Sequence, residues 1–301
     1  MVLTGVVLLI GTYVFIPDQI IVSEVEQVES SERILEKYLS KPEYRREWWP
    51  ATYDEKNFSY DRLQFSFEPG ALNSQPVIIS ARGFRSHSLI SWKLSSKNIF
   101  LLGWKTSIVA SKNPVTRILQ YQHARKIKQS MIGIMESLLT FVVDSKNVYG
   151  ISVERKTVKD TILATTSMIS ASRPRTSDLY QKISHIENFI KKQAVSQVNS
   201  PMINISQDPK GQYQTMIAVP INKDIVPDGD ISLQKMIAGN ILVAEIKGGP
   251  QMVETGFTEM KAYMKDFKLT SPAMPFELLV TNRIAEPDTS KWVTKIFYPI
   301  L

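Results

Sequence analysis

Residues 275–281 read Pro-Phe-Glu-Leu-Leu-Val-Thr, and residues 292–300 read Trp-Val-Thr-Lys-Ile-Phe-Tyr-Pro-Ile. Both runs are rich in aromatic and β-branched residues, and a polar loop with proline and aspartate separates them, so they predict two strands. Strand alternation places Glu277 and Leu279 on one face of the first strand. A carboxylate among apolar neighbours is costly to bury unless it is paired or used. Glu277 is therefore either a paired structural group or the charged contact of a ligand pocket.

The same pattern occurs earlier in the chain. Ile162-Leu163-Ala164 opens one predicted strand, and Ile241-Leu242-Val243 opens another 79 residues later. Each strand leads into a predicted helix, over 177–192 and 253–267 respectively. The strand pairs that follow the two helices end alike, again 79 residues apart. Two strand–helix–strand–strand units in one register predict a pseudo-twofold domain, with a groove between its helices and over the joined sheet.

The second half of the chain, residues 149–301, resembles the GyrI-like effector-binding domain, which also ends AraC-type and multidrug-sensing regulators. The matching features are Lys247-Gly-Gly-Pro250 before the second helix, Pro275-Phe276-Glu277 on a strand, Glu286-Pro-Asp288 in the loop, and the run from Trp292 to Pro299. In that family the strand glutamate lies at the floor of an aromatic-walled cleft and contacts polar or cationic ligands. The resemblance implies this role for Glu277. The chain departs from the family at Leu279 and Gln251, where aromatic residues are usual.

Four residues make up the predicted ligand site: Glu277, Leu279, Trp292 and Tyr213. Trp292 and Tyr213 occupy equivalent places in the two units, and each is either a pocket wall or a core side chain. The resemblance implies a small hydrophobic or cationic ligand. Two other functions stay open. One is hydrolysis with Glu277 as the general base, since some GyrI-like proteins are similar to hydrolases. The other is an envelope scaffold that binds protein partners.

The first half shows a different order of elements. The pattern predicts a strand at 20–28 and a short helix from Ser30 or Ser31 to 38 or 39. Four β-type runs follow, at 58–67, 77–84, 87–94 and 99–109, with a fifth at 115–121. A long amphipathic helix is predicted at 123–143. Together with Trp48-Trp49-Pro50, this order resembles the START-like helix-grip fold (SRPBCC) and its anchored bacterial members. The resemblance implies an antiparallel sheet domain over residues 18–148, closed by the long helix around a cavity.

The chain begins with an apolar segment. Residues 2–16 carry no charge, and Pro17 and Asp18 end the run. It is shorter than the roughly 17–20 residues of a full membrane span. We expect a hydrophobic helix that serves as an uncleaved single-pass membrane anchor over residues 1–17, with the rest of the protein outside the cytoplasm and periplasmic in a Gram-negative source. A signal peptide and a buried N-terminal element are the alternatives.

Composition narrows the function further. The chain of 301 residues has a formal net charge of +7, no cysteine and three histidines that are not at metal-ligand spacing, so we expect no metal site. Residues 69–135 hold ten Lys or Arg and no acid, which indicates either a solvated sheet face or a surface for anionic lipid or another anion. No DNA-binding or RNA-binding motif, catalytic triad, phosphate loop or dinucleotide motif occurs, so we expect no nucleic-acid partner and no cofactor.

These observations combine into one prediction. The fold class is α+β: an N-terminal hydrophobic helix, a helix-grip antiparallel sheet domain, and a duplicated pseudo-twofold domain. The predicted function is that of a membrane-anchored, non-enzymatic protein that binds a small molecule in a cleft of its C-terminal domain. The sequence does not indicate an oligomeric state.

Overall fold

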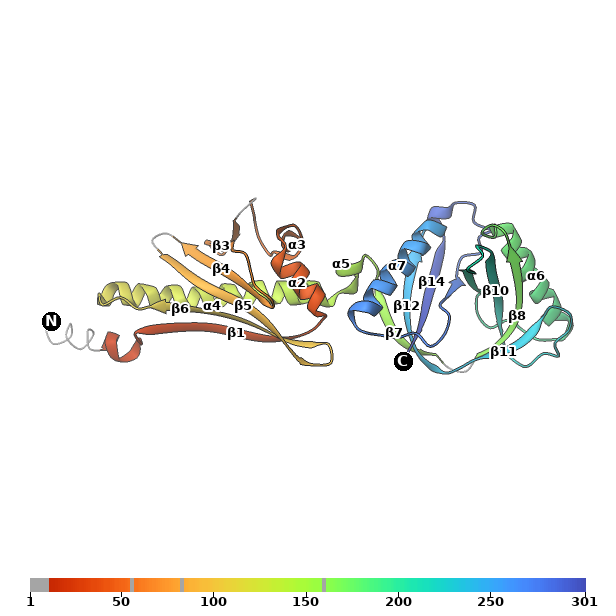
Figure 1. The fold of residues 1–301 in the computed structure, drawn as a ribbon, viewed down its shortest axis with the longest axis horizontal. Coiled ribbons are helices and arrows are strands. Elements are labelled where there is room, and N and C mark those ends of the chain that lie inside the picture. Colours follow the sequence, from red (N-terminus) through yellow and green to blue (C-terminus); the bar gives the residue numbers. More distant parts are fainter. Residues whose placement is uncertain (1–10, 55–56, 82–83, 159–160) are drawn as a thin grey trace. The chain divides into compact units, whose positions relative to one another are not determined.

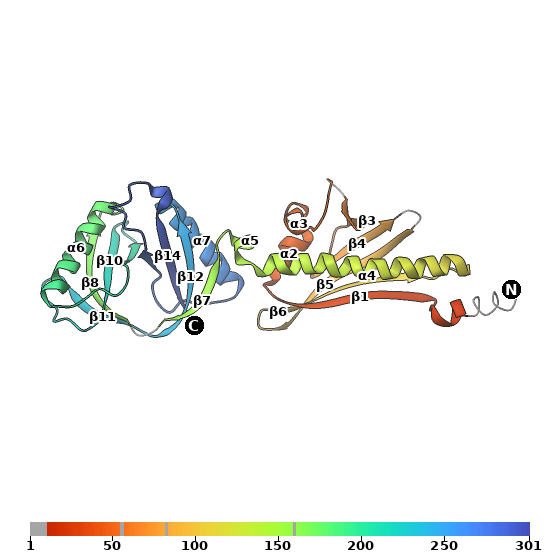
Figure 2. The same ribbon diagram turned by 180° about the vertical axis from the view of Figure 1, so that it is seen from behind.

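The computed structural model describes residues 11–301 except 55–56, 82–83 and 159–160. The chain divides into two compact units, Met1–Asp144 and Ser145–Leu301. Each unit has helices packed on an antiparallel sheet of its own, so the protein is α+β as expected (Figures 1 and 2).

The first unit is a six-stranded antiparallel sheet with a long helix at its C-terminal end. Its elements are β1 (Gln19–Glu29), α2 (Glu32–Ser40), α3 (Pro42–Trp48), β2 (Phe58–Tyr60), β3 (Leu63–Phe67), β4 (Ser74–Ala81), β5 (Phe84–Ser96), β6 (Ile99–Val109) and α4 (Pro114–Val143). The strands lie in the order β1-β6-β5-β4-β3-β2, and α4 packs along β1 and β6. The expected order of a strand, a short helix, a sheet and a long helix is confirmed, and α3 is a further helix that the pattern did not predict. Membership of the START-like family stays a prediction.

Two expectations about this unit are wrong. Residues 58–67, expected as one strand, form the antiparallel pair β2 and β3, because Asp61 and Arg62 both adopt positive φ and make a tight turn between them.

Residues 115–121, expected as a fifth strand, form the first turns of α4. The Asn113 side chain accepts hydrogen bonds from the backbone N–H groups of Val115 (3.0 Å) and Thr116 (3.2 Å), and Pro114 follows at the first helical position. An asparagine cap before a proline is a strong start signal for a helix. It outweighs the strand preference of Val115 and Ile118.

The N-terminal segment is described only in part. Residues 1–10, which make up most of the expected anchor and hydrophobic helix, lie outside the described residues. Residues 11–15 form a helical turn, and the carbonyl oxygen of Ile16 accepts a 3.0 Å hydrogen bond from Nε of the buried Arg117. Within the part of the chain that the structure describes, no helix is both long and apolar enough to cross a membrane.

The second unit is an eight-stranded antiparallel sheet with two long helices. Its elements are α5 (Ser145–Tyr149), β7 (Val153–Val158), β8 (Thr161–Ser170), α6 (Thr176–Lys192), β9 (Met202–Gln207), β10 (Tyr213–Ile221), β11 (Ser232–Met236), β12 (Gly239–Lys247), α7 (Pro250–Asp266), β13 (Phe276–Leu279), the short 3-10 helix η1 (Thr289–Lys291) and β14 (Val293–Ile300). The strand order is β11-β8-β10-β9-β13-β14-β12-β7.

This order confirms the predicted duplication. The first copy is β8-α6-β9-β10 and the second is β12-α7-β13-β14, and the two copies join where β9 pairs with β13. In Figure 1, α7 lies beside β12 and β14, and α6 beside β8 and β10. At the join, Glu277 lies opposite Ile203. The carboxylate therefore stands on the central strand pair of the sheet.

The helices bury one face of this sheet in two clusters. Under α6, Ile186 (0% exposed) packs with Ile203 and Ile217, and under α7, Met260 (0% exposed) packs with Ile296. Burial of apolar side chains of this size contributes roughly 1.5–3 kcal/mol each to folding. The two clusters hold the helices on one face of the sheet, and Glu277 stands on the strand pair between them.

Candidate ligand-binding sites on the second sheet

A cleft of about 400 Å³ opens on the helix-bearing face of the second sheet. Strands β9 and β13 contribute to its lining, and α7 and β14 supply further residues, with Arg173 from the loop before α6. Three of its lining residues are aromatic: Phe257, Phe276 and Tyr298. The rings of Phe257 and Tyr298 meet edge to face at 6.1 Å between centroids. The predicted cleft over the sheet is thus present and has aromatic walls.

Glu277 lines this cleft and is paired with an arginine. Nη2 of Arg283 lies 3.2 Å from Oε2 of Glu277 and donates a 2.8 Å hydrogen bond to the hydroxyl of Thr294. Glu277 is 6% exposed and Arg283 is 7% exposed. Burial raises the pKa of the Glu277 carboxyl above its ordinary value, although the nearby charge of Arg283 lowers it. The carboxyl therefore holds a proton more readily than one in water.

The loop that carries Arg283 is fixed on both sides. The Arg283 guanidinium lies over the ring of Trp292, 5.0 Å from its centroid. The indole Nε1 of Trp292 donates a 2.7 Å hydrogen bond to the carbonyl of Glu286. From α6, the hydroxyl of Tyr180 accepts a 2.8 Å hydrogen bond from the backbone N–H of Arg283. These contacts hold the guanidinium against the carboxylate.

The four residues of the predicted site separate into two groups. Glu277 and Trp292 contact the same side chain, Arg283. Leu279 is 2% exposed and packs in the cluster under α6. Tyr213 is half-buried at the start of β10. Of the four, Glu277 alone is among the described residues that line the cleft, and Trp292, Leu279 and Tyr213 line neither the cleft nor the cavity on the other face.

Arg283 is the residue that sequence reasoning missed. It lies six residues after Glu277, in the loop between the two strands that the carboxylate pattern had singled out. A buried carboxylate requires a partner, and the closest arginine in sequence was available to supply it. The rim of the cleft is also charged, because Arg173 and Glu254 form an ion pair there and Lys261 lines the same cleft.

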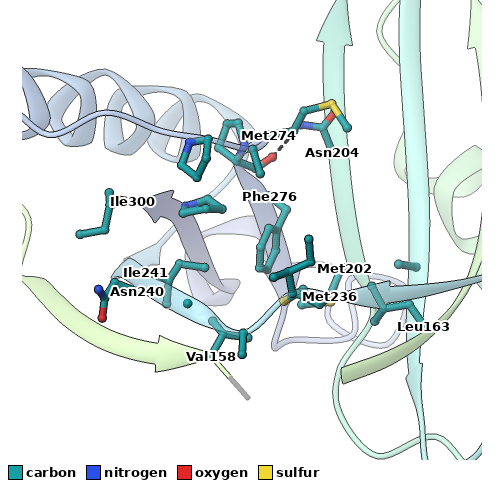
Figure 3. A pocket seen from close by; sticks show the side chains of 18 of the residues that line it. Val158, Leu163, Met202, Asn204, Met236, Asn240, Ile241, Met274, Phe276 and Ile300 are labelled. Carbon is teal, nitrogen blue, oxygen red and sulfur yellow. Dashed lines mark hydrogen bonds between the residues drawn. The ribbon is translucent and has the colours of Figure 1, made fainter. Parts of the chain in front are cut away.

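A second cavity, of about 550 Å³, lies on the opposite face of the same sheet, because Leu163 and Ile241 line it while their strand neighbours Ala164 and Leu242 face the helices. Figure 3 shows the side chains that line it. Phe276 and Met202 line it from the central strands, and Ile241 and Ile300 line it from the outer ones. Its labelled side chains are mostly apolar, and the amide of Asn204 donates a 2.6 Å hydrogen bond to the carbonyl of Pro275 at its edge (Figure 3).

Within the described ranges, no group of three or more Asp, Glu and His side chains could hold a metal ion.

No family model and no curated protein matches the sequence. Several solved structures are similar over part of the chain. The C-terminal domain of EcmrR is 15% identical, with a TM-score of 0.44, over 50% of this chain and 98% of its own. SAV2435 bound to tetraphenylphosphonium is 16% identical, with a TM-score of 0.34, over 50% of this chain and 94% of its own. A hydrolase from Listeria innocua is 11% identical, with a TM-score of 0.38, over 50% of this chain and 91% of its own.

Proposed function

We propose that the second unit is a GyrI-like ligand-binding domain, and that its helix-face cleft takes a small molecule with an apolar body and a positive charge. The observation that carries this proposal is the buried Glu277 carboxylate in a cleft with aromatic walls. Aromatic faces attract cations by about 0.5–2 kcal/mol, more when water is excluded. A cationic ligand would therefore gain from Phe257 and Tyr298 as well as from the carboxylate.

Arg283 has a positioning role in this proposal. Its pairing with Oε2 of Glu277 holds the carboxyl in place and favours the ionised form, while burial favours the protonated form. A cation binds the ionised form of the carboxylate. Because the pKa of Glu277 is raised, we expect the affinity for a cation to fall as the pH drops through that raised pKa.

The proposal is tested by calorimetric titration with tetraphenylphosphonium, the cation in the SAV2435 structure. Wild type is expected to bind it, and Glu277→Gln to bind at least about tenfold more weakly, equivalent to about 1.4 kcal/mol. Tetraphenylborate has the same shape and the opposite charge, so it should not compete.

The matched control is Glu245→Gln. Glu245 is also a strand glutamate, but it is exposed and paired with Lys295 at 3.6 Å, and its loss should leave the affinity within about twofold of wild type. Equal affinity of wild type and folded Glu277→Gln for tetraphenylphosphonium would contradict the proposal.

A second inference concerns the expected membrane contact. The end of the first unit that carries the N-terminal segment exposes apolar side chains from three segments, since Phe15 is 83%, Val109 77% and Val115 66% exposed. The three segments lie together: the Arg117 guanidinium donates to the carbonyl of Ile16, and the backbone N–H of Ala110 donates to that of Asp18 at 2.8 Å. Apolar side chains in a region with an excess of basic residues suit an anionic bilayer surface.

This inference predicts binding to lipid vesicles. The full chain should co-sediment with vesicles that contain phosphatidylglycerol and bind pure phosphatidylcholine vesicles more weakly. Phe15→Ser with Val115→Ser should reduce the bound fraction several-fold, because both side chains leave water on binding. Leu94→Ser, at a 53% exposed leucine on β5 outside these segments, is the control and should bind as wild type does. Binding unaffected by the double substitution would contradict the inference.

A further inference from the structure

The cavity on the helix-free face of the second sheet is set by strand alternation. Ala164 on β8 and Ile217 on β10 point into the helix-side core, so their neighbours Leu163, Met216 and Ala218 point the other way and line the cavity. The same alternation applies to the second copy, where Leu242 is in the core and Ile241 lines the cavity (Figure 3). The cavity is therefore built by both copies of the duplicated unit.

Its lining is apolar and adaptable. Four methionines line it, Met202, Met216, Met236 and Met274. Methionine is unbranched and polarisable, so a pocket rich in it adjusts to ligands of different outlines. The volume of about 550 Å³ lies within the range of roughly 300–1,000 Å³ that is typical of small-molecule pockets.

The charges around the cavity argue against a charged ligand. No acidic residue is among its described lining residues, and Lys235 is the ionisable residue in that set. Lys235 is already paired with Asp224 at 3.7 Å, and its side chain is 65% exposed. A charged ligand would lose its hydration in an apolar cavity without gaining a buried counter-ion, which is costly.

The mouth of the cavity is apolar as well. Ile237, in the turn between β11 and β12, is 89% exposed, and Met274, in the segment before β13, is 56% exposed. The hydrogen bond from the Asn204 amide to the carbonyl of Pro275 ties that segment to β9 (Figure 3). A hydrophobic molecule can enter favourably through such a mouth, because the exposed apolar side chains there contact it before it reaches the cavity.

We propose that this cavity is a second binding site, distinct from the helix-face cleft, for an uncharged hydrophobic small molecule. The two sites lie on opposite faces of the sheet and differ in chemistry: the cleft has a buried carboxylate, and the cavity has methionine and aliphatic walls. Phe276 lines both. A cationic ligand would bind on the helix-bearing face of the sheet, and an uncharged ligand on the opposite face.

The test uses N-phenyl-1-naphthylamine, a neutral probe that fluoresces in apolar sites, titrated into the full chain. Wild type is expected to bind one equivalent. Ala218→Phe places a phenyl ring in the cavity and should weaken binding at least about tenfold. Met274→Glu places a charge at the mouth and should weaken it several-fold. Met274 is 56% exposed, so Met274→Glu is expected to fold normally. It tests the cavity even if Ala218→Phe does not fold.

Two controls separate this site from the cleft. Met252→Glu makes the same change at a 52% exposed methionine of α7, on the helix-bearing side, and should bind the probe as wild type does. Glu277→Gln should also leave probe binding unchanged, whatever it does to tetraphenylphosphonium. The proposal is overturned if wild type does not bind the probe, if folded Ala218→Phe and Met274→Glu bind it normally, or if Glu277→Gln abolishes binding.

Discussion

Replacing Arg283 by methionine is expected to destabilise the second unit by about 3–5 kcal/mol at pH 7, since it removes one partner of a buried ion pair. Glu277 is 6% exposed in the wild-type protein, and the substitution removes the cation that pairs with its carboxylate. It also removes the 2.8 Å hydrogen bond to Thr294. Hydrogen exchange measures the effect locally: amides of β13 and β14 should lose protection by this amount, while those of β5 and β6 should not change.

The loss should depend on pH in a defined direction. Without Arg283, the folded-state pKa of Glu277 rises further above its unfolded value, so the folded protein binds a proton more readily than the unfolded chain. Stability then increases as the pH falls through the raised pKa, and the deficit of the variant is largest at neutral pH and shrinks on acidification. A deficit that grows on acidification would contradict this assignment of the pair.

Two further variants sharpen the result. Arg155→Met, at an exposed position on β7, makes the same change without a buried partner and should stay within about 0.5 kcal/mol of wild type. Glu277→Leu combined with Arg283→Met removes both charges and should recover a large part of the loss. An Arg283→Met protein as stable as Arg155→Met would mean that the pair contributes nothing to the fold.

The duplication could be predicted from sequence because it leaves a repeat that does not depend on contacts. The 79-residue register relates Ile217 to Ile296, and both are core residues. The first strands are displaced by one residue from that register: Ala164 and Leu242, 78 residues apart, are the two that face the helices. In a strand, a shift of one residue exchanges the faces. The triplets that open the two strands, at 162–164 and 241–243, are therefore similar in sequence, but equivalent positions in them point to opposite faces of the sheet.

Arg283, the partner of Glu277, could not be predicted from the repeat because it lies in a loop that differs between the two copies. Residues 280–292 connect β13 to β14 and carry Arg283, whereas the shorter segment 208–212 connects β9 to β10. A repeat pattern carries no information about an inserted loop. The likeness between the copies also ends at the centre of the sheet, where Glu277 of the second copy faces Ile203 of the first. The second copy therefore has a buried ion pair that the first copy lacks, because it has both the longer loop with Arg283 and a glutamate on its central strand.

The aromatic walls of the cleft show the same limit. Trp292 and Tyr213 are equivalent in the two copies, and the sequence left each of them as either a pocket wall or a core side chain. The aromatic residues that line the cleft are Phe257 from α7, Phe276 from β13 and Tyr298 from β14. Helix position relative to the sheet depends on side-chain packing, here of Met260 and Ile296. Such packing is not readable from the period of the sequence.

Trp292 is expected to act through Arg283. Trp292→Ala should reduce protection of the β13 and β14 amides by about 3–5 kcal/mol, the usual cost of truncating a buried tryptophan. The ring is 6% exposed, lies 5.0 Å from the Arg283 guanidinium, and donates its N–H to Glu286 at 2.7 Å. Trp292→Phe keeps an aromatic face for the guanidinium and loses the hydrogen bond, so it should cost less than half as much.

A double-mutant cycle distinguishes this positioning role from direct ligand contact. If Trp292 stabilises Arg283, the losses in Trp292→Ala and Arg283→Met are not additive, and the coupling energy is about 0.5–3 kcal/mol. A ligand-contact role predicts additive losses in stability, together with a tetraphenylphosphonium affinity that drops in Trp292→Phe even though the fold is kept. Coupled stabilities with an unchanged affinity in Trp292→Phe would place Trp292 behind the ion pair, as the structural support that keeps Arg283 against the carboxylate.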